Sequence, residues 1–381
     1  MKRVVHLLMS DYSVDSRVKN ETISLAESGF DVTVFCLKGK NLSVKEVSDG
    51  VSINRFGLLG LGGKVRFFTA LVSIITKSIF IKIDLVHAHD LNALPLAFLI
   101  SKIKRSKLVY DSHELWSQAH HRKRLPLILK AVEKVELFIS KRCDAVIAVS
   151  DGITDFLKSY FGINSVTTIR NIPSYQTKGS HDLFREEFGI SDNTKIFLYQ
   201  GLISESRGVN VILKAAESLA KKEGLAFVFL GDGPYAVEII NRIKNKKLRS
   251  VFYKKFVPQN ILLNYTKSAD VGVHAIKNSC LNHDLCLPNK LFEYLSAEKP
   301  VIVSNLKEMK SFVESYQVGK VFDESDSRSL VLAIDDITRD PDTLGTLKDN
   351  IVELNRSLNW KEESKKLIEL YFKVLGSESA R

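Results

Sequence analysis

Residues 287–304 read LPNKLFEYLSAEKPVIVS. Pro288 precedes an amphipathic stretch that predicts a helix over 290–297, and Pro300 precedes an apolar run that predicts a buried strand over Val301–Ser304. A helix that leads at once into a buried strand is typical of a parallel sheet covered by helices on both faces.

The start of this predicted helix also contains charged residues that suit a ligand. Lys290 and Glu293 share one helix face, because residues three apart are neighbours on a helix. A lysine beside helix-terminal amides suits a phosphate, and a carboxylate one turn further along suits a sugar diol. Leu287, Pro288 and Asn289 lead into the same helix start, so the motif suits a nucleoside diphosphate with its ribose.

Apolar runs and amphipathic stretches alternate along the whole chain, and the pattern occurs twice. In the first half they predict strands at Val4–Met9, Val32–Leu37, Leu85–Ala88, Leu108–Tyr110 and Ala145–Val149, with helices over 18–28, 65–80, 94–102 and 125–142. In the second half they predict strands at Ile196–Gln200, Ala226–Leu230, Val271–His274, Val301–Ser304 and Gly319–Phe322, with helices over 209–222, 235–243, 259–265, 290–297 and 307–314.

These elements predict an α/β fold with two doubly wound parallel-sheet domains, residues 1–170 and 171–359. A polar linker over 170–181 joins them, and a last amphipathic helix spans Trp360–Leu375. Ligands of such sheets bind beyond the carboxyl ends of the strands. A cleft between the two domains is therefore the expected place for a small ligand.

Composition limits the function classes. The chain has 381 residues, 45% hydrophobic and 26% charged, which is enough for two globular domains. The four cysteines are scattered without a CxxC pair, so they indicate reduced thiols and neither a disulfide framework nor a zinc site. The apolar run Val4–Met9 is too short for a signal peptide, and charged residues interrupt the run over 67–86, so no membrane span is expected.

The net charge of +11 lies mainly in the first half, where residues 1–170 contain 25 Lys and Arg against 16 Asp and Glu. An anionic membrane, a nucleic acid and a merely solvated surface could each explain this excess. Apolar residues mixed with the basic ones (Val65, Phe67, Phe68 and the stretch 120–127) favour the membrane over nucleic acid. No nucleic-acid-binding motif is recognised, so no nucleic-acid partner is expected.

Two loops in the second half suit a phosphate. Gly231, Asp232 and Gly233 follow a predicted strand, where glycines let backbone amides approach a ligand closely; the alternative is a plain turn. Gly201 ends another strand, and Arg207 lies just before the next helix, where a guanidinium can grip a phosphate; the alternative is an exposed arginine.

Polar residues also follow the strands of the first half. His113 and Glu114 lie in the segment YDSHELW after the strand Leu108–Tyr110, without the spacing of a closed metal site. The segment HAHD follows the previous strand, and His87 and Asp90 there could simply cap the next helix.

The loop after the first strand contains Ser13, Asp15 and Arg17. Such a loop faces the ligand in this architecture, so Arg17 could reach a phosphate or an acceptor. Asp15 or Ser16 could instead be only a helix N-cap.

In this order, these segments resemble a retaining glycosyltransferase of the large GT4 family, which has the GT-B fold of two Rossmann-like domains. The resemblance covers nearly the whole chain and is strongest over 196–305, in YQGLISESRGV, FVFLGDGP, SADVGV and LPNKLFEYLSAEKPVIVS. The loop Asp15-Ser16-Arg17 and the segments HAHD, YDSHELW and AVIAVSDGI add to it.

The resemblance implies roles for individual residues. Glu293 matches the glutamate that binds the donor's ribose, Arg207 and Lys290 match the diphosphate contacts, and His113 matches the histidine that contacts the donor sugar. Residues 231–234 resemble the loop near the nucleotide. The helix over 360–381 resembles the segment that crosses back to the first domain.

The chain departs from the family pattern at three places. Leu285 replaces a glutamate that often holds the donor sugar, which shifts that contact to the backbone over 285–287, to Asn282 or to Asp284. Leu202 replaces an arginine and leaves the diphosphate to Arg207 and Lys290. Residues 255–256 replace an expected glycine near the base.

The implied reaction transfers a sugar from a nucleotide-sugar donor, such as a UDP- or GDP-sugar, to a glycan or a polyprenyl- or other lipid-linked acceptor. It uses no metal and no further cofactor, and closure of the two domains would assemble the site. The expected location is cytoplasmic, on the inner face of the membrane if peripheral. A nucleotide-sugar epimerase of the same fold and a non-catalytic nucleotide-sugar-binding protein are the alternatives.

Overall fold

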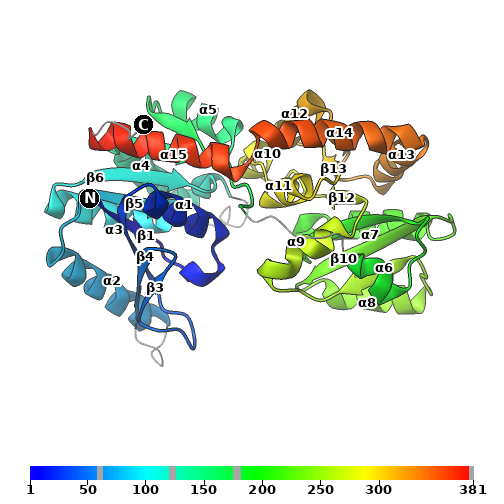
Figure 1. The fold of residues 1–381 in the computed structure, drawn as a ribbon, viewed down its shortest axis with the longest axis horizontal. Helices are drawn as coiled ribbons and strands as arrows, with labels where there is room; N and C mark the ends of the chain where they lie inside the picture. Colours follow the sequence, from blue (N-terminus) through cyan, green and yellow to red (C-terminus); the bar gives the residue numbers. More distant parts are fainter. Residues whose placement is uncertain (58–62, 120–125, 175–181, 377–381) are drawn as a thin grey trace. The chain divides into compact units, whose positions relative to one another are not determined.

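The computed structural model describes residues 1–57, 63–119, 126–174 and 182–376, which form two compact α/β units (Figure 1). Unit 1 comprises Met1–Asn171 together with Trp360–Arg381, and unit 2 comprises Ile172–Asn359. Each unit has its own sheet and its own core. The predicted α/β fold with two parallel-sheet domains is confirmed.

The sheet of unit 1 has eight strands in the order β3-β4-β2-β1-β5-β6-β7-β8. All neighbours run parallel except β3 and β4. The strands are β1 (Arg3–Leu7), β2 (Asp31–Leu37), β3 (Lys45–Ser48), β4 (Val51–Phe56), β5 (Leu85–His89), β6 (Lys107–Ser112), β7 (Ala145–Ala148) and β8 (Val166–Thr168).

The hairpin of β3 and β4 was absent from the sequence prediction, although the residues contain its signal. Asp49 and Gly50 connect the strands and both have positive φ, at 52° and 77°. Two left-handed residues make the turn whose twist matches a hairpin, and Asp-Gly is a favoured pair for it. β4 alternates buried and half-buried side chains, as expected for a strand with one covered face.

Six α-helices belong to the described part of unit 1. They are α1 (Ser16–Glu27), α2 (Gly63–Ile79), α3 (Asp90–Lys104), α4 (Pro126–Ser140), α5 (Asp151–Ser159) and α15 (Trp360–Leu375), with short 3₁₀ turns η1 (Tyr12–Val14) and η2 (Trp116–Gln118). The chain's last helix, α15, packs beside α1 (Figure 1), and the Trp360 indole donates to the Ser24 hydroxyl at 2.9 Å. Leu367, Leu370 and Tyr371 of α15 are buried in the core of this unit.

The sheet of unit 2 has six parallel strands in the order β11-β10-β9-β12-β13-β14. They are β9 (Lys195–Leu202), β10 (Leu225–Asp232), β11 (Val251–Lys254), β12 (Val271–His274), β13 (Val301–Ser304) and β14 (Gly319–Phe322). Along β9, Phe197 and Tyr199 belong to one core cluster, and Ile196 and Leu198 belong to another. This sheet is therefore buried on both faces, as the continuous apolar runs predicted.

The helices of unit 2 cover both faces of its sheet. They are α6 (Leu183–Phe188), α7 (Val209–Ser218), α8 (Ala236–Asn245), α9 (Gln259–Lys267), α10 (Leu281–Leu285), α11 (Asn289–Ser296), α12 (Lys307–Tyr316), α13 (Ser327–Thr338) and α14 (Pro341–Ser357), with the 3₁₀ turn η4 (Glu205–Arg207). Helices α7, α8 and α13 supply one core cluster, and α11, α12 and α14 supply the other.

Several further elements were missing from the sequence prediction, namely β8, β11, α5, α6, α10 and the longer helices α13 and α14. Part of the predicted linker, 175–181, lies outside the described residues, as does most of the stretch 120–127. Among the described helices, none is long and apolar enough to cross a membrane.

Candidate active site

In unit 2, the predicted glycine loops lie side by side at the carboxyl edge of the sheet. Gly201 and Gly231 occupy neighbouring positions of the paired strands β9 and β10, with φ of 128° and 152°. A Cβ on Gly231 would lie 1.9 Å from the Gly201 carbonyl oxygen, and one on Gly233 would lie 2.4 Å from that of Ile203. Only glycine permits this approach. Between them, Asp232 is about half exposed.

Lys290 lies over this edge. A Cβ on Gly201 would lie 3.2 Å from Lys290 Cε, so the aliphatic part of the lysine covers the glycine. Its ammonium contacts both carboxylate oxygens of Glu293 at 2.9 Å. The Gln200 side-chain amide also donates to Glu293, and Thr266 donates to the Gln200 carbonyl at 2.8 Å. The Glu293 carboxylate is therefore held in one orientation beside a lysine that is only partly exposed.

Helix α11 starts one residue before the predicted range 290–297. Pro288 is its N-cap, with no side-chain cap, and Asn289 is its first residue. The first amides of the helix are left without an intrahelical partner. The Leu287 side chain is buried in the core, so only its backbone can face a ligand.

Arg207 lies at the end of η4, directly before Gly208. Gly208 has φ of 69°, and a Cβ there would lie 1.6 Å from the Ala275 carbonyl oxygen. This close approach joins the Arg207 turn to the end of β12. The guanidinium has no ion-pair or hydrogen-bond partner in the described part of the chain. Burial is the main cause that lowers the pKa of His274, the last residue of β12, to about 3, and the charges of Arg207, Lys290 and His283 contribute to the same shift. Arg207 and Lys290 both lower the pKa of the His274 imidazole, so both positive charges lie near this side chain.

The departures from the family pattern in this part of the chain are Leu202 and Leu285, the latter with Asn282 and Asp284 nearby in sequence. Leu285 and Asn282 are both buried, and Asp284 accepts the Lys307 amide at 2.9 Å. Leu202 is exposed at the end of β9.

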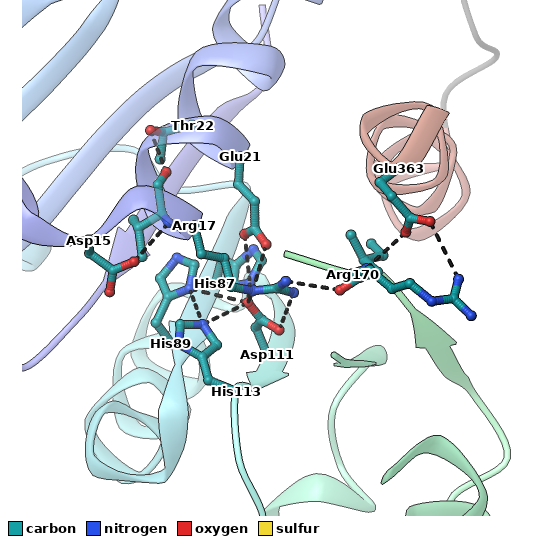
Figure 2. Close-up of polar contacts among 12 residues, drawn as sticks. Asp15, Arg17, Glu21, Thr22, His87, His89, Asp111, His113, Arg170 and Glu363 are labelled. Carbon is teal, nitrogen blue, oxygen red and sulfur yellow. Dashed lines mark hydrogen bonds and ion pairs between the residues drawn. The ribbon is translucent and has the colours of Figure 1, made fainter. Parts of the chain in front are cut away.

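In unit 1, a buried ionic cluster surrounds Asp111 at the end of β6 (Figure 2). Both Asp111 oxygens accept from the Arg17 guanidinium at 2.8 Å, and Arg17 also donates to the Ile169 carbonyl at 2.9 Å. Glu21 lies 3.1 Å from the same guanidinium. The sequence prediction for Arg17 was wrong: it lies inside α1, 2% exposed, and its donors are used within the protein.

His113 sits between two carboxylates. Its Nε2 lies 2.9 Å from Asp111 and its Nδ1 lies 3.4 Å from Asp90, which also accepts the His113 backbone amide. Burial alone lowers the pKa of His113, but the charges of Asp90 and Asp111 outweigh it and raise the pKa to about 10. His113 is therefore an imidazolium at neutral pH, and about a fifth of its side chain is exposed.

A chain of hydrogen bonds runs inward from His113. Its Nε2 lies 3.3 Å from His89, His89 bonds to His6 at 2.9 Å, and Tyr371 of α15 bonds to both His6 and His87. The idea that His87 only caps a helix was wrong, because His87 is buried within β5.

These side chains also bring several metal-ligand types together. Potential ligand atoms of His6, Glu21, His87 and His89 lie within 4.8 Å of one another, as do those of His89, Asp111 and His113. However, the rings of His6, His87 and His89 stack with centroids 4.4–5.1 Å apart. Their in-plane lone pairs lie in roughly parallel planes and do not meet at one point. With the Arg17 cation against Asp111, the arrangement fits a hydrogen-bonded array better than a metal centre.

The remaining predicted residues of unit 1 lie near its surface. Asp15 is the N-cap of α1 and accepts the Val18 amide at 3.1 Å, as its helix-cap alternative proposed. Ser13 belongs to η1, and its carbonyl accepts from Lys19. The Glu114 carbonyl accepts from Ser112, and its side chain is half-buried.

Comparison with known proteins decides the family. Residues 14–172 match the profile of Glycosyltransferase Family 4, and residues 180–354 match that of Glycosyl transferases group 1. The chain is a GT4-type glycosyltransferase. YtcC of Bacillus subtilis strain 168, named as a glycosyltransferase, is 22% identical over 91% of this chain and 84% of its own.

Solved structures support the GT-B fold of this glycosyltransferase. Sucrose-phosphate synthase from Thermosynechococcus elongatus has a TM-score of 0.80, with 18% identity over 99% of this chain and 100% of its own. HepE of Anabaena in complex with UDP has a TM-score of 0.77, with 16% identity over 98% of this chain and 100% of its own.

Several polar residues of these clusters were not predicted from the sequence. Gln200 and Thr266, which orient Glu293, lie inside elements that read as plain apolar strand and helix. Glu21 and Tyr371 lie in helices whose patterns gave no sign of a buried polar partner. Asp111 belonged to a recognised polar segment, but its partner Arg17 is 94 residues away.

Proposed function

We propose that this glycosyltransferase takes its sugar from a nucleoside-diphosphate donor bound at the carboxyl edge of the unit 2 sheet. The observation that carries the proposal is the convergence of Lys290 and Arg207 beside the glycine loops. Glu293, fixed by Gln200, would accept from the ribose hydroxyls. The UDP in the HepE complex makes a UDP-sugar the first donor to test, with GDP-sugars next.

The chemistry requires positive charge at this place. As the bond from the anomeric carbon to the diphosphate breaks, negative charge grows on the leaving phosphate. Cations that are already in place stabilise this charge more in the transition state than in the ground state. We propose transfer with retention, in which the leaving phosphate accepts the acceptor's proton. The prediction that His113 contacts the donor sugar stays a prediction, since both its ring nitrogens are occupied by carboxylates.

We further propose that the transfer needs no metal and no cofactor, because two side-chain cations and helix-terminal amides supply the positive charge. A thermal-shift screen against UDP-, GDP- and ADP-sugars with EDTA present tests donor and metal together. A ligand at one hundred times its Kd stabilises the native state by about 2.7 kcal/mol. We expect one nucleotide sugar to raise the Tm equally with and without EDTA. A shift that appears only with added Mg²⁺ or Mn²⁺ contradicts metal independence, and no shift with any nucleotide sugar contradicts the donor proposal.

For the acceptor, we propose a glycan or a lipid-linked saccharide at an anionic membrane surface. Helices α2, α3 and α4 contact one another in sequence order. Together they expose a set of large apolar side chains, namely Val65, Phe67, Phe68, Val72, Leu99, Ile103, Leu127, Ile128, Val135 and Phe138. Lysines and arginines are interspersed on the same helices. Apolar side chains mixed with basic ones suit the interface of an anionic bilayer, such as the inner face of the cytoplasmic membrane.

Liposome flotation tests this surface. We expect the protein to float with vesicles rich in phosphatidylglycerol. With vesicles of pure phosphatidylcholine it should remain in the bottom fraction. Phe68→Glu, at a side chain 66% exposed, should weaken flotation. Leu332→Glu is the matched control, because Leu332 is 68% exposed on α13 of unit 2. Equal flotation with both lipids, or equal loss in both variants, would refute the proposed membrane surface.

A further inference from the structure

His274 is a buried polar residue of the unit 2 sheet that the proposed function has not yet used. It is the last residue of β12, a strand held between β9 and β13, and only 6% of its surface is exposed. Its Nδ1 is buried and has no hydrogen-bond partner among the described residues. Buried polar atoms in native proteins nearly always have a partner, so an orphan atom at the edge of a ligand site calls for an explanation.

The charged surroundings of His274 keep its ring neutral. The titratable groups that act on it are Arg207 from η4, Lys290 from α11 and His283 from α10, and no carboxylate is among them. The contact of Gly208 with the Ala275 carbonyl fixes the Arg207 turn against the residue that follows His274. A proton on this imidazole would add a third positive charge to a buried place with two, so the ring stays uncharged at physiological pH.

A neutral imidazole carries its one proton on either Nδ1 or Nε2. A proton on Nδ1 would leave a buried N–H without an acceptor, and orphan donors are rarer in native proteins than under-used acceptors. The proton therefore belongs on Nε2, and Nδ1 keeps a lone pair that accepts no hydrogen bond. The ring then offers one N–H donor, at the end of a parallel strand, beside two cations.

We propose that His274 is a third protein ligand of the donor's diphosphate, donating from Nε2–H to a phosphate oxygen that Arg207 and Lys290 attract. This inference rests on the proposed function and adds to it. Because the His274 ring is neutral, it adds no positive charge beside Arg207 and Lys290. Its N–H group still stabilises negative charge on the leaving phosphate by a hydrogen bond. Because the ring does not titrate in the working range, its contribution is constant with pH.

Two substitutions separate hydrogen bonding from packing. His274→Leu fills similar space without an N–H and removes the orphan nitrogen. His274→Gln keeps an N–H donor at a similar reach. Calorimetry measures the Kd of UDP and of GDP for each variant at several values between pH 6 and 8, with uridine and guanosine as controls without phosphate, and Tm reports folding.

We expect His274→Leu to fold with a Tm equal to or above that of the wild type. It should bind the preferred nucleoside diphosphate at least tenfold more weakly at every pH, with the nucleoside unaffected. His274→Gln should stay within threefold of the wild type. If His274→Leu binds the diphosphate as tightly as the wild type, or if His274→Gln fails as badly as His274→Leu, the role of His274 is overturned.

Arg207→Ala distinguishes this failure from failure of the proposed function. If Arg207→Ala loses diphosphate affinity but His274→Leu does not, only the role of His274 is wrong. If Arg207→Ala also binds the diphosphate like the wild type, the proposed donor site itself is wrong.

Discussion

Lys290→Ala should lower kcat/KM for the nucleotide-sugar donor by roughly 10²–10³-fold, which corresponds to about 2.7–4 kcal/mol of lost transition-state stabilisation. The ammonium lies over Gly201 and against Glu293, so its removal leaves the leaving phosphate with one fewer cation. It also leaves the Glu293 carboxylate, only 8% exposed, with Gln200 as its remaining partner, and this unpaired charge repels the diphosphate. Steady-state kinetics with the donor found by the thermal-shift screen measures the effect.

The control is Lys222→Ala, which removes a lysine of the same unit that is paired with Asp335 at 2.7 Å. Lys222 precedes Leu225, the first residue of β10, and so lies at the opposite end of that strand from Gly231. Its loss should therefore leave kcat/KM within twofold. Both variants should keep the wild-type Tm within a few degrees, because each removes a partly exposed side chain. A Lys290→Ala enzyme that transfers sugar at the wild-type rate would refute the placement of the diphosphate.

Asp111→Ala should destabilise unit 1 by about 3–5 kcal/mol, because it leaves the buried Arg17 guanidinium without its bidentate partner. It also removes one of the two carboxylates that hold His113 as an imidazolium. Glu21, 3.1 Å from Arg17, cannot replace the two lost hydrogen bonds, since its oxygens make none in the present geometry. Urea denaturation, followed by circular dichroism, measures the free energy of unfolding.

Two further variants make this test specific. Asp31→Ala breaks an exposed pair with Arg3 and should cost under about 1 kcal/mol. The double variant Arg17→Met/Asp111→Leu removes both charges of the bidentate pair and should recover part of the stability lost in Asp111→Ala. The recovery is partial because the buried Glu21 loses the Arg17 cation. If Asp111→Ala is no less stable than Asp31→Ala, the cluster of Figure 2 does not contribute as described.

The elements of the sheet were predictable where they are short apolar runs. The strands Val271–His274, Val301–Ser304 and Gly319–Phe322 begin and end where the sequence placed them. The first two are buried along their whole length in the parallel sheet, and the third is its edge strand, half-buried up to Phe322. β3 was not predicted because Lys45–Ser48 is an exposed edge strand, and its single apolar residue gives no strand pattern. α13 follows the last predicted strand and has an ordinary amphipathic pattern, so it could have been predicted from the sequence.

The site was predictable where neighbours in sequence are neighbours in space. Lys290 and Glu293 are one helical turn apart, and their contact follows from that spacing. Arg17 was misplaced because nothing local shows that its partner is Asp111, on a strand 94 residues away. His274 was placed correctly at the end of a strand, but its importance depends on cations from two other segments.

Hydrogen–deuterium exchange with and without the stabilising nucleotide sugar tests the central claim most directly, because it locates the bound donor along the backbone. We predict slower exchange over residues 201–209, 231–235 and 287–293, which contain the glycine loops, Arg207 and the start of α11. Saturating donor that leaves these three segments unchanged, and slows exchange elsewhere or nowhere, would contradict it.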